Sequence, residues 1–115
     1  MIKIYGIKNC DTMKKAFTWL DKHKIEYSFH DYKKEGIDAP TIHHWMKKIP
    51  LEQLINSKGP TFRKLSDKEK AAAKEPSTAV DLMMKNTSMI KRPLVVLGKD
   101  QYLLGFKEEE WDTKF

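Results

Sequence analysis

The chain has 115 residues, of which 40% are hydrophobic and 33% are charged. This composition is typical of a globular domain and excludes a disordered or fibrous protein. No apolar run approaches the ~20 residues that cross a bilayer, and the N-terminus lacks the apolar core of a signal peptide, so we expect a cytoplasmic protein with no membrane partner. The net charge is +6, but the lysines are interspersed with acidic residues. We therefore expect a solvated surface and no nucleic-acid partner.

The beginning of the chain predicts a strand, a helix and a second strand. Residues 1–5 alternate apolar and polar side chains, which is typical of a strand. From Asp11 to about Lys22 the apolar residues follow the spacing of an amphipathic helix. Alternation returns over residues 25–30 and predicts another strand. Short links around one helix indicate a βαβ unit with parallel strands.

The middle of the chain predicts helices. Residues 38–49 form a helical pattern that stops before Pro50, and residues 51–55 form a short segment. A loop is predicted over residues 56–60. Ser66-Asp67-Lys68-Glu69 has the sequence of a capping box, which predicts a helix through Ala73. A last middle helix is expected from Pro76 to near Asn86.

The C-terminal part predicts an apolar strand over residues 94–97, a turn, a partner strand over residues 102–106 and a short helix from Glu108. The predicted fold class is therefore α/β, with the four-stranded mixed sheet and flanking helices of a thioredoxin-like fold. We expect a single domain over residues 1–115. Its core covers about residues 1–35 and 88–115, and a helical insertion covers about residues 36–87.

Cys10 is the only cysteine in the chain and cannot form an internal disulfide. It lies between the first strand and the first helix, where unpaired backbone N–H groups and the helix dipole favour a thiolate. Lys8 adds positive charge. A buried structural cysteine is the alternative, but Asn9, Asp11 and Thr12 make this loop too polar for a core. We expect a reactive thiol, with these four neighbours contacting the substrate.

The residue three positions after Cys10 is Met13, so the chain has no Cys-x-x-Cys pair. An external thiol must then complete any disulfide chemistry. Glutathione is the expected co-substrate, and we expect no tightly bound cofactor. His43 and His44 are adjacent and cannot share a metal ion on one helix face, so no metal site is predicted.

Arg92 and Pro93 immediately precede the apolar strand of residues 94–97. A proline there is often a simple stop signal. In a thioredoxin-like sheet, however, a cis-proline at this point packs beside the catalytic cysteine and leaves backbone groups free to pair with an extended substrate. Arg92 would then reach an oxyanion or carboxylate bound at Cys10, and its guanidinium offers a bidentate fork that lysine lacks.

Five segments together resemble the arsenate reductase (ArsC)/Spx family, and most of all its YffB-like branch. They are residues 4–16 (IYGIKNCDTMKKA), 29–32 (FHDY), 61–65 (TFRKL), 90–93 (IKRP) and 103–106 (LLGF). The resemblance covers essentially the whole chain. It implies a thioredoxin-like fold with a helical insertion, a catalytic Cys10, and a catalytic Arg92 joined to a cis Pro93.

The chain departs from the family's arsenate site. Arsenate reductases place three arginines around the oxyanion, and here only Arg92 has its counterpart. The middle position falls at Asn56 and the last at Gly105. Lys58 can supply a positive charge at a substrate site but no bidentate fork. Arg63 lies in a motif that the branch shares, where a structural role is the alternative.

Three functions follow as hypotheses. The first is a monomeric thiol-dependent oxidoreductase that attacks a disulfide or an oxidised small molecule and is resolved by glutathione. The second is arsenate reduction, with glutathione and glutaredoxin recycling the enzyme. The third is a non-catalytic Spx-like regulator that binds RNA polymerase, although Met13 breaks the Cys-x-x-Cys pair of Spx-type switching.

Overall fold

The computed structural model of the chain describes residues 2–115. The chain divides into two units, which we call the sheet unit (residues 1–31 and 92–115) and the helical unit (residues 32–91). The predicted insertion, residues 36–87, lies inside the helical unit, and the single-domain organisation remains a prediction. Within the described residues, no helix has both the length and the apolar character needed to cross a bilayer.

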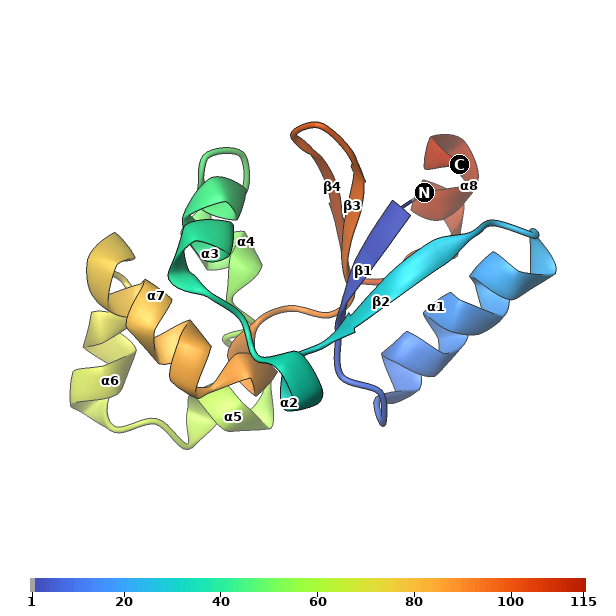
Figure 1. Cartoon of the computed structure of the whole chain (residues 1–115). Coiled ribbons are helices and arrows are strands. Elements are labelled where there is room, and N and C mark those ends of the chain that lie inside the picture. The colour runs from blue at the N-terminus through green and yellow to red at the C-terminus, as the bar shows by residue number, and fades with distance from the viewer. Residues whose placement is uncertain (1) are drawn as a thin grey trace. The chain divides into compact units, whose positions relative to one another are not determined.

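The sheet unit contains a four-stranded mixed sheet with the order β2-β1-β3-β4. Its strands are β1 (Ile2–Gly6), β2 (Tyr27–Asp31), β3 (Leu94–Gly98) and β4 (Gln101–Leu104). In Figure 1, β1 in blue lies between β2 in cyan and the β3–β4 hairpin in orange. β1 pairs with β2 in parallel and with β3 in antiparallel orientation. The predicted thioredoxin-like α/β sheet is therefore confirmed.

Helix α1 (Asp11–Lys22) and helix α8 (Glu108–Lys114) complete the sheet unit. The apolar stripe of α1 is buried, as its spacing predicts. One core joins both helices to the sheet and consists of Ile4, Met13, Ala16, Trp19, Leu20, Val95, Leu103 and Trp111. The Cys10 side chain packs at the edge of this core without being enclosed by it.

The second strand begins at Tyr27, two residues later than the alternation of residues 25–30 predicts. Ile25 instead helps to end α1, because its N–H donates to the Leu20 carbonyl at 3.0 Å. Lys24 has a φ of +56° and donates to the Asp21 carbonyl at 3.1 Å. These two bonds are the Schellman arrangement that closes a helix C-terminus. It usually contains glycine at the position of Lys24, so the sequence gives little sign of it.

The helical unit contains short helices whose ends are closed locally. They are α2 (Tyr32–Glu35), α3 (Ala39–Met46), α4 (Leu51–Leu54), α5 (Pro60–Arg63), α6 (Asp67–Ala72), α7 (Pro76–Lys85) and the 3-10 turn η1 (Thr87–Met89). The predicted capping box at Ser66 and Glu69 is present. A bridge between Ile55 and Ile90 ties the segment after α4 to the end of the unit.

Two expectations for the helical unit are wrong in detail. The loop predicted over residues 56–60 gives way to a helix at Pro60, where the proline occupies a first-turn position that needs no N–H donor. The helix predicted over residues 38–49 ends at Met46. Its last residues form tighter turns, with Lys47 and Lys48 bonded three residues back to His44 and Trp45.

Candidate active site

Cys10 occupies the N-cap position of α1, with φ −131° and ψ 131°. Its carbonyl accepts the first helical bond from the Lys14 N–H at 3.0 Å. The backbone N–H groups of Met13 and Thr12 act on the sulfur and lower the pKa of the thiol, although the Cys10 side chain makes no capping hydrogen bond. The unpaired N–H groups of this helix start therefore favour negative charge at the sulfur without the capping bond that an aspartate N-cap would make. Cys10 as a whole is half-buried and is a free thiol.

The peptide bond between Arg92 and Pro93 is cis, as the resemblance implies. Pro93 is buried and leads directly into β3. Leu94 pairs with Tyr5 near the C-terminal end of β1. Pro93 therefore lies at the same end of the central strands as the loop that contains Cys10. The Pro93 carbonyl accepts a hydrogen bond from the Gly105 N–H at 2.9 Å, which fixes this corner of the sheet unit.

The surroundings of Cys10 favour its charged form. Partial burial acts to raise the pKa of the thiol, but the Met13 backbone N–H, the Arg92 side chain and the Thr12 backbone N–H lower it, and so does the positive charge of Arg92. The lowering effects outweigh burial, so the pKa of the Cys10 thiol lies below its ordinary value. The site can therefore hold an anion at the sulfur position and present a nucleophilic thiolate.

The position that a second cysteine would occupy is part of the core. Met13 is fully buried, and its side chain lies over Gly6 at the end of β1. A Cβ at Gly6 would lie 2.5 Å from Sδ and 2.6 Å from Cε of Met13. The close approach of helix to strand at this point therefore requires both the glycine and the flexible thioether.

The family model for ArsC proteins matches residues 5–114 of this chain. The chain belongs to the ArsC family. It is 37% identical over 115 residues to an uncharacterised protein of Haemophilus influenzae, with 100% of this chain and 99% of the relative covered. It is 26% identical to the global transcriptional regulator Spx of Streptococcus pyogenes, covering 96% of this chain and 81% of Spx. A solved structure named YffB protein superposes with a TM-score of 0.92 at 45% identity, covering 99% of this chain and 98% of the other.

The structure gives a physical reason why this ArsC-family chain has no arginine at Gly105. Gly105 is buried and has a φ of +75°, a conformation that L side chains rarely adopt. Its carbonyl accepts a hydrogen bond from the indole Nε1 of Trp111 at 3.2 Å. An arginine at this corner would be strained, and β4 ends at Leu104 instead of running to residue 106 as predicted.

The remaining predicted site residues differ in what the structure shows of them. Lys8, Asn9 and Asp11 are exposed around the Cys10 loop, while Thr12 is half-buried. Lys58 is exposed in the helical unit, and its role in substrate binding remains a prediction. The sequence could not single out the Met13 N–H as a group that acts on the sulfur, because every residue except proline carries that group. Within residues 2–115, no three His, Cys, Asp or Glu side chains gather as a metal site.

Proposed function

We propose that this ArsC-family protein is a thiol-dependent oxidoreductase in which Cys10 is the nucleophile and glutathione is the resolving thiol. The observation that carries the proposal is the position of Cys10 at the start of α1, where nearby backbone N–H groups and the Arg92 guanidinium lower the thiol pKa. The buried Pro93, at the end of the sheet from which the Cys10 loop departs, supports it. A structural cysteine has no need of such surroundings.

The proposed reaction has two thiol–disulfide exchanges. In the first, the Cys10 thiolate attacks the glutathione sulfur of a mixed disulfide RS–SG; the Cys10–S–SG bond forms and RS⁻ leaves. In the second, a glutathione thiolate attacks Cys10–S–SG, which releases glutathione disulfide and regenerates the Cys10 thiolate. The net reaction reduces RS–SG to RSH and oxidises one further glutathione. Since the chain has a single cysteine, both exchanges pass through Cys10.

Arg92 has two roles in this proposal. It stabilises the Cys10 thiolate before attack, and its guanidinium can hold a carboxylate of glutathione during the exchange. We assign Pro93 the role of leaving the adjacent backbone open to an extended substrate. Lys8, Asn9, Asp11 and Thr12 on the Cys10 loop, together with Lys58, are the proposed secondary contacts to the substrate.

The proposal is tested by turnover and by mass. We expect the protein to reduce a glutathionylated peptide with glutathione, coupled to glutathione reductase and NADPH, and we expect Cys10→Ser to lose this activity by at least about 100-fold. Incubation with glutathione disulfide should add one glutathione to the protein and none to Cys10→Ser. Equal turnover by the two proteins would contradict the proposal.

Arsenate is a poorer substrate for this site. The left-handed conformation of residue 105 would strain the last arginine of the family pattern, and Asn56 stands at the middle position. Each missing arginine removes a charge-assisted contact of roughly 1.5–3 kcal/mol. We therefore expect arsenate-dependent glutathione oxidation to be no faster with this protein than with Cys10→Ser. A clear Cys10-dependent arsenate rate would instead assign arsenate reduction.

A further inference from the structure

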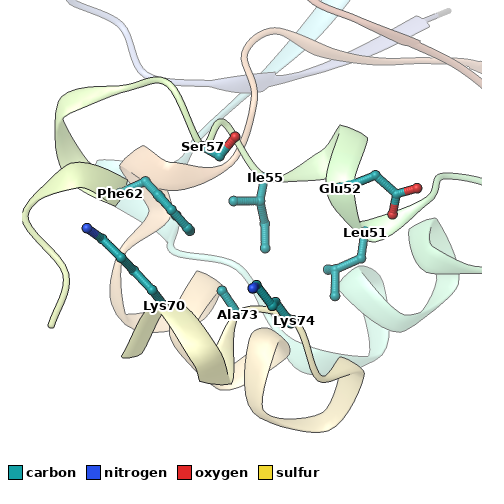
Figure 2. Close-up of a pocket in the computed structure, with 8 residues that line it drawn as sticks. All are labelled: Leu51, Glu52, Ile55, Ser57, Phe62, Lys70, Ala73 and Lys74. Atoms are coloured by element: carbon teal, nitrogen blue, oxygen red, sulfur yellow. The ribbon is translucent and has the colours of Figure 1, made fainter. Parts of the chain in front are cut away.

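The helical unit contains a cavity of about 280 Å³, and none of its lining residues belongs to the Cys10 loop. Its walls come from α4, the turn after it, α5, and the end of α6 (Figure 2). The lining residues are Leu51, Glu52, Ile55, Ser57, Phe62, Lys70, Ala73 and Lys74. The proposed redox chemistry gives this cavity no role.

The floor and sides of the cavity are apolar. Leu51, Ile55, Phe62 and Ala73 supply aliphatic and aromatic surface, and Figure 2 shows them around a common space. An apolar cavity of about 150 Å³ is known to hold one benzene molecule. A cavity of about 280 Å³ therefore suits a fused two-ring aromatic group, with Phe62 offering an aromatic contact.

The charged residues of the lining are unequally distributed. Lys70 lies in the last turn of α6, Lys74 lies two residues beyond the end of that helix, and both line the cavity. Neither lysine forms an ion pair within the part of the chain that the structure describes. Figure 2 shows Lys70 on the Phe62 side of the cavity and Glu52 on the Leu51 side. Two ammonium groups and one carboxylate give the lining a net positive charge.

We propose that this cavity binds a small aromatic carboxylate. The ring system fills the apolar space against Ile55 and Phe62, and the carboxylate faces the Lys74 ammonium group, while the flexible Lys70 side chain adds positive charge on the Phe62 side. An apolar body with one charged group is the usual complement of a pocket lined mostly by apolar surface with few polar groups. Glu52 opposes a second negative charge and so favours a monoanion.

A titration of the ¹⁵N-labelled full chain with 1-naphthoate tests the proposal. We expect saturable shifts of the amide signals of Ile55, Phe62 and Ala73, with a Kd on the order of 1 mM or below for a ligand of this size. The neutral analogue 1-naphthalenemethanol is the matched control. It should bind at least about 3-fold more weakly at low salt, and this difference should shrink as salt is added.

Three variants separate charge from shape. The double variant Lys70→Gln with Lys74→Gln should weaken 1-naphthoate binding by about 10-fold and leave 1-naphthalenemethanol unchanged. Glu52→Gln should strengthen 1-naphthoate binding by about 2-fold. Ala73→Leu fills the cavity and should abolish binding of both ligands. Thermal unfolding followed by circular dichroism confirms that each variant is folded; the lysine and glutamate variants carry the test if Ala73→Leu is not.

Several outcomes would overturn the proposal. Shifts that stay absent up to the solubility limit of the ligand, or that fall on the Cys10 loop instead, would remove the site. Equal binding of the acid and the alcohol would remove the role of the two lysines. Shifts of the same amides on raising the protein concentration without ligand would mean that a second copy of the chain occupies the cavity.

Discussion

Two helices of this protein begin from the same extended backbone and complete their first turns differently. At α6, the Ser66 Oγ accepts from the Glu69 N–H at 3.1 Å, and the Glu69 carboxylate accepts from the Ser66 N–H at 3.0 Å. At α1, Cys10 stands in the place of Ser66 and Met13 in the place of Glu69. Met13 is buried in the core and cannot return a hydrogen bond.

The α6 start is closed by its own side chains and stabilises the helix, whereas the α1 start leaves backbone N–H groups that can stabilise an anion. Hydrogen bonds with Ser66 lower the pKa of the Glu69 carboxyl, so the α6 start carries a permanent charge at neutral pH. At α1 the acceptor is a thiol, whose charge depends on pH and on Arg92. The Glu69 carboxylate is chemically inert, whereas a thiolate at the start of α1 can attack a disulfide.

Of the changes that distinguish the two helix starts, removing Arg92 should have the largest effect, and it acts on the Cys10 thiol. We expect Arg92→Ala to raise the pKa of Cys10, since the variant loses both a hydrogen bond and a nearby positive charge. Alkylation by iodoacetamide at pH 7 should slow by only about 3- to 5-fold, because a more basic thiolate is intrinsically a better nucleophile. The pH dependence of the alkylation rate measures both quantities.

Arg92→Lys is the control for that experiment. It keeps a positive charge while losing the planar fork, so the thiol pKa should lie between those of the native protein and Arg92→Ala. Circular dichroism melts of both variants show whether the corner at Pro93 is intact. A midpoint of the alkylation profile that does not move in Arg92→Ala would show that the helix start alone sets the pKa.

Breaking the cap of α6 should affect stability and leave the thiol unchanged. We expect Ser66→Ala to lower the free energy of unfolding by about 1 kcal/mol, because the Glu69 N–H loses its side-chain acceptor. Urea unfolding measures this loss. The Cys10 alkylation profile should be the same as in the native protein, and Ser66→Asp, which keeps an acceptor, should restore stability. A changed alkylation profile would contradict the separation of the two helix starts.

Much of the fold can be read from the sequence, and the exceptions have physical causes. The stripe of α1 and the apolar run of β3 are strong signals because burial imposes their periodicity. The capping box of α6 is equally clear, since two side chains define it. The closing motif at Lys24 is not, because glycine is the usual signal and lysine stands in its place. Four-residue helices such as α5 are too short to show a periodic pattern.

The candidate site is predictable in its side chains but not in its backbone. Cys10 and Arg92 stand out by residue type, and the family resemblance implies the cis bond at Pro93. The backbone N–H groups that lower the thiol pKa and the left-handed conformation of Gly105 depend on how the chain turns in space. The cavity of the helical unit is likewise invisible in the sequence, because its walls come from segments that are each too short to reveal a partner.

The smallest expected effect is on stability as a function of pH. The pKa of the Cys10 thiol is lower in the folded protein than in the unfolded chain, where it is near 8.5. Such a thiol stabilises the fold fully only above the unfolded pKa. This stabilisation is lost as the pH falls through the folded pKa. The native protein should therefore gain stability over Cys10→Ser between pH 6 and pH 9.5. We expect a gain of at most about 1 kcal/mol, since water screens the half-buried sulfur.

Urea unfolding of both proteins in the presence of a phosphine reductant measures this difference. The lysines and carboxylates are shared by the two chains, so their titration cancels and only the residue at position 10 contributes. If the difference in unfolding free energy between the two proteins does not change between pH 6 and pH 9.5, the sulfur has the same pKa in the folded and unfolded chain. The start of α1 would then hold no anion, and its likeness to the capped start of α6 would be one of backbone shape alone.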